Sequence, residues 1–135
     1  MDRPDTPGFS LLELLITLAI VAILATITVP SFNGLVAKTR RGDAMAALVL
    51  IQLAQERWRG EHPRYAEALE PLGWSSPQSQ DGHYRLRIVR ADAVDFLAVA
   101  QPSGVQQSDA CGVYALDSNG PVYEQGYAGS DCWER

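Results

Sequence analysis

The sequence predicts an α+β fold in which a long N-terminal hydrophobic helix, kinked at Pro30, packs on a small antiparallel β-sheet. Three observations lead to this prediction. An apolar run extends from Phe9 to Val29. After it, apolar residues recur at three- to four-residue steps, which is typical of an amphipathic helix. Towards the C-terminus, short segments alternate between apolar and polar residues, which is typical of half-buried strands.

The composition allows one domain and an anchor. A chain of 135 residues is too short for two independent cores. The formal net charge is -5 and the pI is about 4.9. Between Phe9 and Phe32 the only ionisable side chain is Glu13. Nearly all charge therefore lies in a water-soluble head, and its negative sign argues against general attraction to nucleic acid.

The apolar run is long enough to cross a membrane. As a helix, its 21 residues would span about 31 Å, close to the thickness of the hydrocarbon core. A cleaved secretory signal is the alternative. The run is longer than a usual signal core, however, and no A-x-A cleavage site stands out. We therefore expect one membrane-spanning helix, preceded by a short polar segment, Met1–Gly8.

Pro30 is expected to kink this helix without ending it. The residues from Thr26 to Val29 are all β-branched, which weakens the helix locally. Proline also removes one backbone hydrogen bond and disfavours helical geometry in the residue before it. The combination predicts a kink or a loosened turn.

The next segment has one apolar face, which is available for the core of the head. The residues on that face are Ala44, Leu48, Ile51, Ala54 and Trp58, while Lys38, Arg40, Arg41, Asp43, Gln52 and Arg59 fall elsewhere. This helix should end near Gly60, before the pair His62-Pro63.

The rest of the chain predicts a loop and an antiparallel meander. Residues 61–82 read as a loop with one helical turn between Tyr65 and Leu72. Strands are expected over Tyr84–Ile88, Val94–Ala100 and Cys111–Leu116, and a short fourth strand over Val122–Glu124 after a turn at Asp117–Gly120.

Two cysteines, Cys111 and Cys132, lie near the C-terminus. An even number of cysteines behind an export-type segment favours a disulfide and an oxidising compartment. Two unrelated buried thiols are the alternative. The spacing differs from the CxxC pairing of metal and redox sites.

The residues around the start of the apolar run resemble the prepilin signature of type IV pilins and pseudopilins. They are Gly8, Phe9, Ser10, Leu11, Leu12, Glu13 and Leu14, preceded by a polar leader. The resemblance implies that a prepilin peptidase cuts after Gly8 and methylates the new amino terminus at Phe9. It also implies that Glu13 neutralises the amino terminus of a neighbouring subunit during assembly. An acid inside a membrane helix is unfavourable, which independently indicates a partner. An acid that merely reaches the headgroups is the alternative.

The C-terminal half carries a second resemblance. The segment Ala110–Leu116, the pair Asn119-Gly120 and the residues Asp131-Cys132-Trp133 are similar to the disulfide-bounded loop of PilE-like minor pilins. The family's pilin fold agrees with the α+β class predicted above.

Three features depart from the usual pattern of the family. The leader holds one Arg and two Asp, where prepilin leaders are usually basic. Lys38, Arg40 and Arg41 all follow the span, so the positive-inside rule alone would place the head in the cytoplasm. Ala22 stands where many pilins have glycine. The cysteines and the prepilin motif favour a periplasmic head.

The sequence thus predicts three parts: a leader over residues 1–8, a transmembrane and filament-core helix over 9–32, and a globular pilin head over 33–135 with a C-terminal disulfide loop. The function implied is that of a minor pilin of a type IV pilus, which supports pilus biogenesis and hence twitching motility and adhesion. It would reside in the inner membrane with a periplasmic head, and then in the extracellular pilus. Expected partners are other major and minor pilins, the prepilin peptidase, the inner-membrane assembly machinery and, before assembly, the membrane.

Two other functions stay open. One is a pseudopilin of a type II secretion or competence system, and the other is a single-pass anchored binding domain that never polymerises. No catalytic constellation stands out, so we expect no enzyme activity, no metal site and no cofactor; His62 and His83 are isolated in the sequence. Arg85, Arg87 and Arg90 fit a solvated strand face better than a DNA-binding stripe, and we do not expect nucleic acid as a partner.

Overall fold

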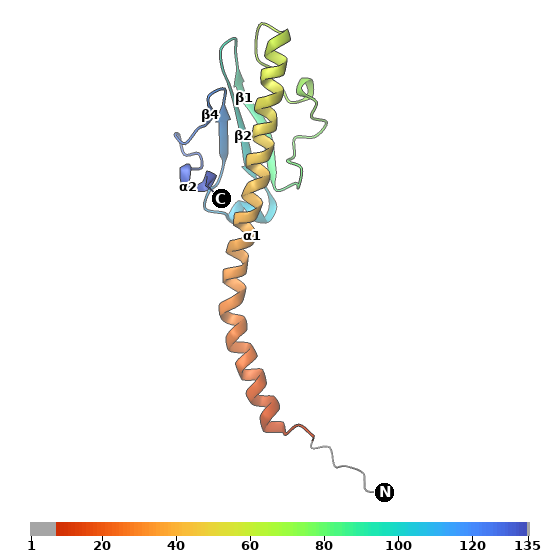
Figure 1. The fold of residues 1–135 in the computed structure, drawn as a ribbon, viewed down its shortest axis with the longest axis vertical. Helices are drawn as coiled ribbons and strands as arrows, with labels where there is room; N and C mark the ends of the chain where they lie inside the picture. The colour runs from red at the N-terminus through yellow and green to blue at the C-terminus, as the bar shows by residue number, and fades with distance from the viewer. Residues whose placement is uncertain (1–7, 135) are drawn as a thin grey trace. The chain divides into compact units, whose positions relative to one another are not determined.

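The computed structural model describes residues 8–134, apart from the side chains of residues 30 and 31. The predicted leader therefore lies outside the described residues, except for Gly8. Figure 1 shows a long helix, a four-stranded sheet and short helical turns in the loops. The elements are α1 (Leu11–Glu61), η1 (Glu70–Leu72), β1 (Tyr84–Ala91), β2 (Phe96–Pro102), η2 (Gly104–Ser108), β3 (Tyr114–Asp117), β4 (Gly120–Pro121) and α2 (Ser130–Trp133).

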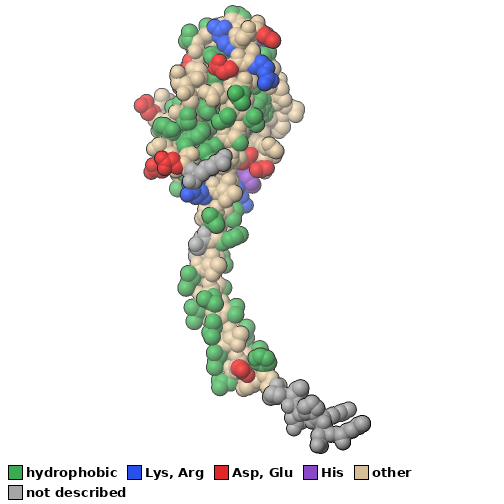
Figure 2. Space-filling model, viewed as in Figure 1, with side chains coloured by type: hydrophobic (Ala, Val, Ile, Leu, Met, Phe, Trp, Pro, Cys, Tyr) green, Lys and Arg blue, Asp and Glu red, His purple; other side chains and the backbone are tan. Residues whose placement is uncertain are grey.

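The chain forms two compact units, one up to Val36 and one from Ala37 onward. In the first unit, α1 is long and apolar enough to cross a membrane. Hydrophobic side chains cover its surface there (Figure 2). The helix continues through Pro30 rather than ending at it, as expected. The kink at Pro30 stays a prediction.

The second unit is the head, in which the later part of α1 packs on the sheet. Ala44, Leu48 and Ile51 of α1 are fully buried, as the apolar spacing predicted. They share one core with Tyr84 of β1 and Phe96 of β2. The sheet has the order β1-β2-β3-β4 and all its pairs are antiparallel. The predicted α+β class is therefore confirmed.

A second, smaller apolar cluster covers the other face of the sheet. Leu97, Val99 and Ala115 are buried there, and they pack against three partly buried residues: Val113 just before β3, and Val122 and Tyr127 of the C-terminal segment. Two backbone hydrogen bonds attach the C-terminal segment here: Val122 N donates to Ala115 O of β3 at 2.9 Å, and Ala128 N donates to Val113 O, next to β3, at 2.8 Å. The C-terminal segment thus runs along the β3 edge of the sheet, and its Val122 and Tyr127 pack on the face opposite α1.

The strand boundaries differ from the sequence prediction at both hairpins. Asp92 Oδ1 accepts hydrogen bonds from Val94 N at 2.8 Å and Asp95 N at 2.9 Å. This local turn keeps Val94 out of β2, which begins at Phe96. Strand β3 begins only at Tyr114, because Gly112 just before it has a positive φ of 62°.

The fourth strand is earlier than predicted. Asp117 Oδ1 accepts from Asn119 N at 2.7 Å and from Gly120 N at 3.1 Å, which tightens the turn. Gly120 has a φ of 126°, a conformation that glycine adopts readily, and it already pairs with Asp117. Strand β4 is therefore Gly120–Pro121, and the predicted strand over residues 122–124 is wrong.

The prediction that Asp43 falls outside the core-facing side of α1 is also wrong. Its side chain is buried and accepts hydrogen bonds from Ser79 Oγ, Asp81 N and His83 N. A buried carboxylate is tolerated because several donors satisfy it. Asp43 thereby fixes the end of the loop that leads into β1.

Candidate functional site

The N-terminal site begins where α1 begins. Gly8, Phe9 and Ser10 precede the helix, and all three are exposed. Ser10 Oγ accepts a hydrogen bond from Leu12 N at 3.3 Å, and Glu13 Oε2 accepts one from Ser10 N at 3.4 Å. These two bonds form a capping box, in which the side chains of a serine and a glutamate each accept a hydrogen bond from a backbone N–H at the start of the helix. The bond between Gly8 and Phe9 therefore lies outside the helix and is accessible.

Glu13 carries the only negative charge on the apolar part of α1. In the part of the chain that the structure describes, it makes no ion pair. Its one side-chain hydrogen bond found there is the long contact to Ser10 N. The carboxylate is thus held close to the place where cleavage after Gly8 would create an amino terminus.

Three threonines interrupt the apolar surface without leaving unsatisfied hydroxyl groups. Thr17, Thr26 and Thr28 donate through Oγ1 to the carbonyl oxygens of Glu13, Ile23 and Leu24, each at 2.7 Å. Hydroxyl groups that bond to the preceding turn are compatible with an apolar environment, although such bonds slightly weaken a helix. The surface of α1 around Glu13 is therefore suited to a bilayer or to another apolar helix.

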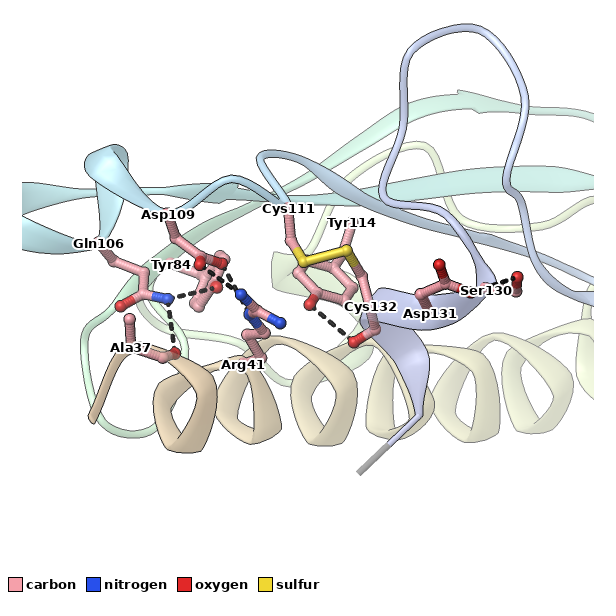
Figure 3. The surroundings of a disulfide bond; sticks show 10 residues. All are labelled: Ala37, Arg41, Tyr84, Gln106, Asp109, Cys111, Tyr114, Ser130, Asp131 and Cys132. Carbon is pink, nitrogen blue, oxygen red and sulfur yellow. Dashed lines mark hydrogen bonds and ion pairs between the residues drawn. A yellow bond between two sulfur atoms is a disulfide. The ribbon is translucent and has the colours of Figure 1, made fainter. Parts of the chain in front are cut away.

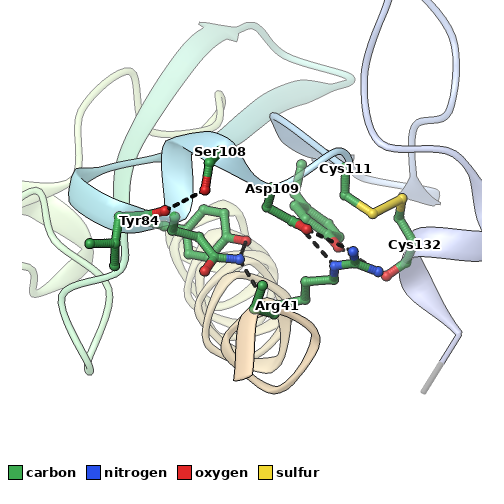
Figure 4. Close-up of polar contacts among 10 residues, drawn as sticks. Arg41, Tyr84, Ser108, Asp109, Cys111 and Cys132 are labelled. Atoms are coloured by element: carbon green, nitrogen blue, oxygen red, sulfur yellow. Dashed lines mark hydrogen bonds and ion pairs between the residues drawn. A yellow bond between two sulfur atoms is a disulfide. The ribbon is translucent and has the colours of Figure 1, made fainter. Parts of the chain in front are cut away.

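In the head, one loop is attached to α1 by a cluster of polar contacts (Figure 4). Arg41 binds the carboxylate of Asp109 through two hydrogen bonds, from Nε at 2.9 Å and from Nη2 at 2.7 Å. Gln106 Nε2 donates to Ala37 O at 3.0 Å and to Tyr84 Oη at 3.1 Å. Burial raises the pKa of the Tyr84 phenol, so this group stays neutral. The cluster fixes η2 on the first turns of α1 in the head.

Cys111 and Cys132 form the predicted disulfide (Figure 3), with their Cα atoms 5.8 Å apart. Tyr114 lies beside it: its Oη donates to Cys132 O at 2.9 Å. The Tyr114 ring also packs edge-on against Trp133, with centroids 5.3 Å apart. The disulfide thus joins the loop before β3 to α2, near the end of the C-terminal segment.

Neither histidine lies in a catalytic arrangement. The ring of His62 stacks on Trp58 with centroids 3.6 Å apart, and its Nδ1 lies 2.9 Å from Trp58 O. His83 takes part in the Asp43 contact only through its backbone N–H. Within residues 8–134, no cluster of three or more His, Cys, Asp or Glu side chains could hold a metal ion.

Comparison with known proteins decides the family. Residues 30–115 match the family model described as "Type IV minor pilin ComP, DNA uptake sequence receptor". Residues 6–29 match the prokaryotic N-terminal methylation motif. The chain belongs to the type IV pilin family. Its members are structural proteins, and the resemblance inferred from the Gly8–Leu14 segment is confirmed.

Relatives and a solved structure agree with this assignment. The pilin is 30% identical to the type IV major pilin PilA of Myxococcus xanthus over 67% of its own length but only 41% of that protein. It is 32% identical to the type IV wide pilus major component PilA4 of Thermus thermophilus over 74% of this chain and 76% of that protein. A solved type IV pilin from Shewanella oneidensis superposes with a TM-score of 0.51 and 27% identity, covering 73% of this chain and 99% of that one.

The pairing of the two cysteines is confirmed, while the roles of Gly8, Phe9, Glu13 and Pro30 stay predictions. Sequence reasoning missed several residues that organise this pilin. The capping role of Ser10 was readable from the S-x-x-E spacing. The Arg41–Asp109 pair joins residues 68 positions apart, and no local signal points to it. Gln55 is fully buried and exchanges two hydrogen bonds of 2.8 Å with the backbone of Ala66, a role that only the tertiary structure reveals.

Proposed function

We propose that this pilin is a minor subunit of a type IV pilus, processed at Gly8 and Phe9 and assembled through α1. It would be stored in the inner membrane with its head in the periplasm. Prepilin peptidase would cut after Gly8 and methylate the amino group of Phe9. The inner-membrane assembly machinery would then move α1 from the bilayer into the filament, among other major and minor pilins. In this role the subunit supports pilus biogenesis, and through it twitching motility and adhesion.

The observation that carries the proposal is an apolar face of α1 that extends beyond any membrane. A bilayer needs about 20 apolar residues, and the run ends at Val29. Well past that point, Val49, Leu50 and Leu53 are 44%, 52% and 57% exposed. With Ala46 they follow the three- and four-residue spacing of one helix face. In an anchored monomer this second apolar stripe would stay exposed to water, which is unfavourable, whereas a filament would bury it between subunits.

Glu13 supports assembly rather than simple anchoring. A carboxylate in an apolar segment is unfavourable unless a cation is close. The amino group of Phe9 in a neighbouring subunit would supply that cation once the leader has been removed. The capping box keeps the carboxylate near the helix terminus, where it can reach such a partner.

The choice of a minor subunit rests on the description of the matching family model. The Myxococcus and Thermus relatives carry the names of major pilins, so the ratio of subunits must be measured. Mass spectrometry of filaments sheared from cells measures both processing and ratio. We expect the chain to start at N-methyl-Phe9 and to be far less abundant than the major pilin. Filament-associated protein that retains residues 1–8 would contradict the proposal.

A second candidate function is DNA uptake, because the family model is described as a receptor for a DNA uptake sequence. Arg85 and Arg87 are exposed on β1, and neither forms an ion pair within the described part of the chain. The net charge of -5 argues against it. Binding of duplex DNA by the full chain tests this function. If Arg85 and Arg87 contact phosphates, the double variant Arg85→Gln, Arg87→Gln should bind more weakly, and the number of counter-ions released on binding should fall by about two.

A further inference from the structure

A hollow opens at the surface of the head, in the loop that joins α1 to β1 (Figure 1). Its volume is about 280 Å³, and it is lined by Gly73, Trp74, Ser75, Ser76 and Gln78. All five residues belong to the second compact unit, so the hollow depends on neither the membrane helix nor a neighbouring subunit. Its lining combines one aromatic ring with neutral polar side chains and holds no charged residue.

Backbone contacts fix the shape of this loop on both sides of the hollow. On one side, Trp74 N donates to Leu69 O at 3.2 Å, and Gly73 turns the chain out of η1 with a φ of 98°, which glycine adopts readily. On the other side, Leu86 N of β1 donates to Pro77 O at 2.6 Å. A ligand would therefore bind to a loop that is already ordered, and little conformational entropy would be lost on binding.

Trp74 contributes an aromatic surface to the hollow. Its side chain is half-buried, because part of it packs against the main core of the head while part lines the hollow. The indole Nε1 is accessible and makes no hydrogen bond within the described chain. Trp74 thus presents an apolar ring and one free donor, a combination that favours a ligand with both apolar and hydroxyl groups.

The other side chains of the hollow also have hydrogen-bonding capacity that the fold does not use. Ser75, Ser76 and Gln78 are exposed, and their side chains make no hydrogen bond among residues 8–134. Each hydroxyl can donate and accept, and the amide carries two N–H donors and one carbonyl acceptor. Polar groups that converge on one hollow without partners in the chain are available to orient a ligand.

This set of groups selects a sugar ring over other ligands. A sugar ring presents C–H groups on its face and hydroxyl groups around its edge, which match an indole surrounded by neutral donors and acceptors. Nucleic acid fits less well, because the lining holds no cation and the net charge of the chain is -5. Proline-rich peptides bind grooves lined by aromatic side chains, whereas this lining has a single ring.

We propose that this hollow binds a neutral saccharide chain. One sugar ring stacks on Trp74, and its hydroxyl groups exchange hydrogen bonds with Ser75, Ser76 and Gln78. The volume lies just below the range of about 300–1,000 Å³ that is usual for drug-sized ligands, so we expect the site to hold one ring at a time and to bind weakly. This function goes beyond assembly, because it gives the head a contact with polysaccharide whether or not the pilin is in a filament.

Titration of the full chain in phosphatidylcholine nanodiscs tests the proposal. The probes are maltohexaose, cellohexaose and chitohexaose, and nuclear magnetic resonance follows the indole N–H groups of the three tryptophans. We expect at least one probe to shift the Trp74 signal saturably, with a dissociation constant of about 1 mM. Trp58 stacks on His62 and Trp133 Nε1 is buried, so their signals should not move. The proposal is wrong if no probe shifts Trp74, or if all three signals move alike.

Variants locate the binding site. Ser75→Ala with Ser76→Ala removes two exposed hydroxyl groups that make no contact in the fold, and the affinity should fall about five-fold for each hydrogen bond lost. Trp74→Phe keeps a ring but loses the donor and should also bind about five-fold more weakly. The matched change Trp58→Phe should bind like the wild type. An unchanged Trp133 signal shows that each variant is folded, and wild-type affinity in the serine variant would overturn the proposal.

Competition separates the saccharide from the other ligand classes. A thymidine oligonucleotide and a proline-rich peptide are each added to discs that contain the bound oligosaccharide. We expect neither to displace it at equal concentration. If the oligonucleotide displaces it, the ring is a platform for bases, and if the peptide displaces it, the hollow is a peptide groove. Either result would contradict a saccharide site.

Discussion

Arg41 and Asp109 join α1 to the loop between β2 and β3 through two parallel hydrogen bonds of 2.9 and 2.7 Å. The Asp109 side chain is 4% exposed and the Arg41 side chain is 20% exposed. Fork-shaped contacts of this kind fix orientation as well as distance. Together with Gln106 they set where the head begins on α1.

Removing the charge of Asp109 should therefore destabilise the head. Asp109→Asn leaves the Arg41 guanidinium largely enclosed without its counter-charge. We expect a loss of about 2 kcal/mol, less than for a fully buried pair because Arg41 retains some contact with water. Urea unfolding in detergent, followed by circular dichroism, measures it. Asp131→Asn, at an exposed position, is the control; an equal change in both variants would contradict a special role for the pair.

The disulfide should hold the C-terminal loop on the sheet. Cys111 and Cys132 are 21 residues apart, and closing such a loop stabilises a fold by about 3 kcal/mol in the chain-entropy model. In the double variant Cys111→Ser, Cys132→Ser, we expect the amides of Val122 and Ala128 to lose protection first, because they hold the loop on β3. Hydrogen exchange measures this. Unchanged protection of both amides would mean that apolar packing alone keeps the loop in place.

Asp95 should make the head sensitive to acid. Burial alone would raise its pKa, but hydrogen bonds from Ser118 and Arg90 outweigh burial, and the pKa is lowered. A carboxyl group whose pKa is lower in the folded state stabilises the fold above its unfolded pKa of about 3.9. That stabilisation is lost as the pH falls through the folded value.

Asp95→Asn tests this directly. At neutral pH the variant should be less stable than the wild type, because Arg90 and Ser118 lose a charged acceptor. As the pH falls from about 4 through the lowered pKa of Asp95, the gap should close, and the two proteins should converge below that pKa. Urea unfolding at several pH values measures the gap. A gap that does not change with pH would show that the carboxylate charge contributes nothing.

Gly8 should matter to processing and not to folding. A Cβ atom built at Gly8 meets nothing within 4 Å, so Gly8→Glu leaves the described fold unstrained. We expect this variant to accumulate in the inner membrane with residues 1–8 attached. Intact-mass measurement reports the result. Gly34→Ala, also at an open position, should be processed normally. Normal cleavage of Gly8→Glu would contradict the assigned cleavage position.

The sequence predicted periodic features well and long-range polar contacts poorly. Ala44, Leu48 and Ile51 were placed in the core because apolar spacing follows helix geometry directly. Asp43 was placed outside the core-facing side because charge normally indicates solvent. Its partners come from a loop 36 to 40 residues away, and only folding brings them together. The strand near residue 122 was misplaced because Asp117 and Gly120 make a tighter turn than the composition suggested.

We propose that the charge of Glu13 drives assembly, and the incorporation of variants into filaments measures this. Tagged Glu13→Ala and Ser10→Ala are compared in cells whose other pilins are normal. Both variants disrupt the capping box, but only the first removes the charge. Ser10→Ala should weaken the helix start by about 1 kcal/mol and still enter filaments.

Glu13→Ala should insert in the membrane and fold its head normally, yet be nearly absent from sheared filaments. If this variant entered a filament, the amino group of Phe9 in the neighbouring subunit would be buried without a counter-charge. Quantitative mass spectrometry of the sheared fraction gives the ratio of each variant to the major pilin. Glu13→Ala at the wild-type ratio would show that apolar packing alone drives assembly. Equal loss of both variants would show that the capping box matters rather than the charge.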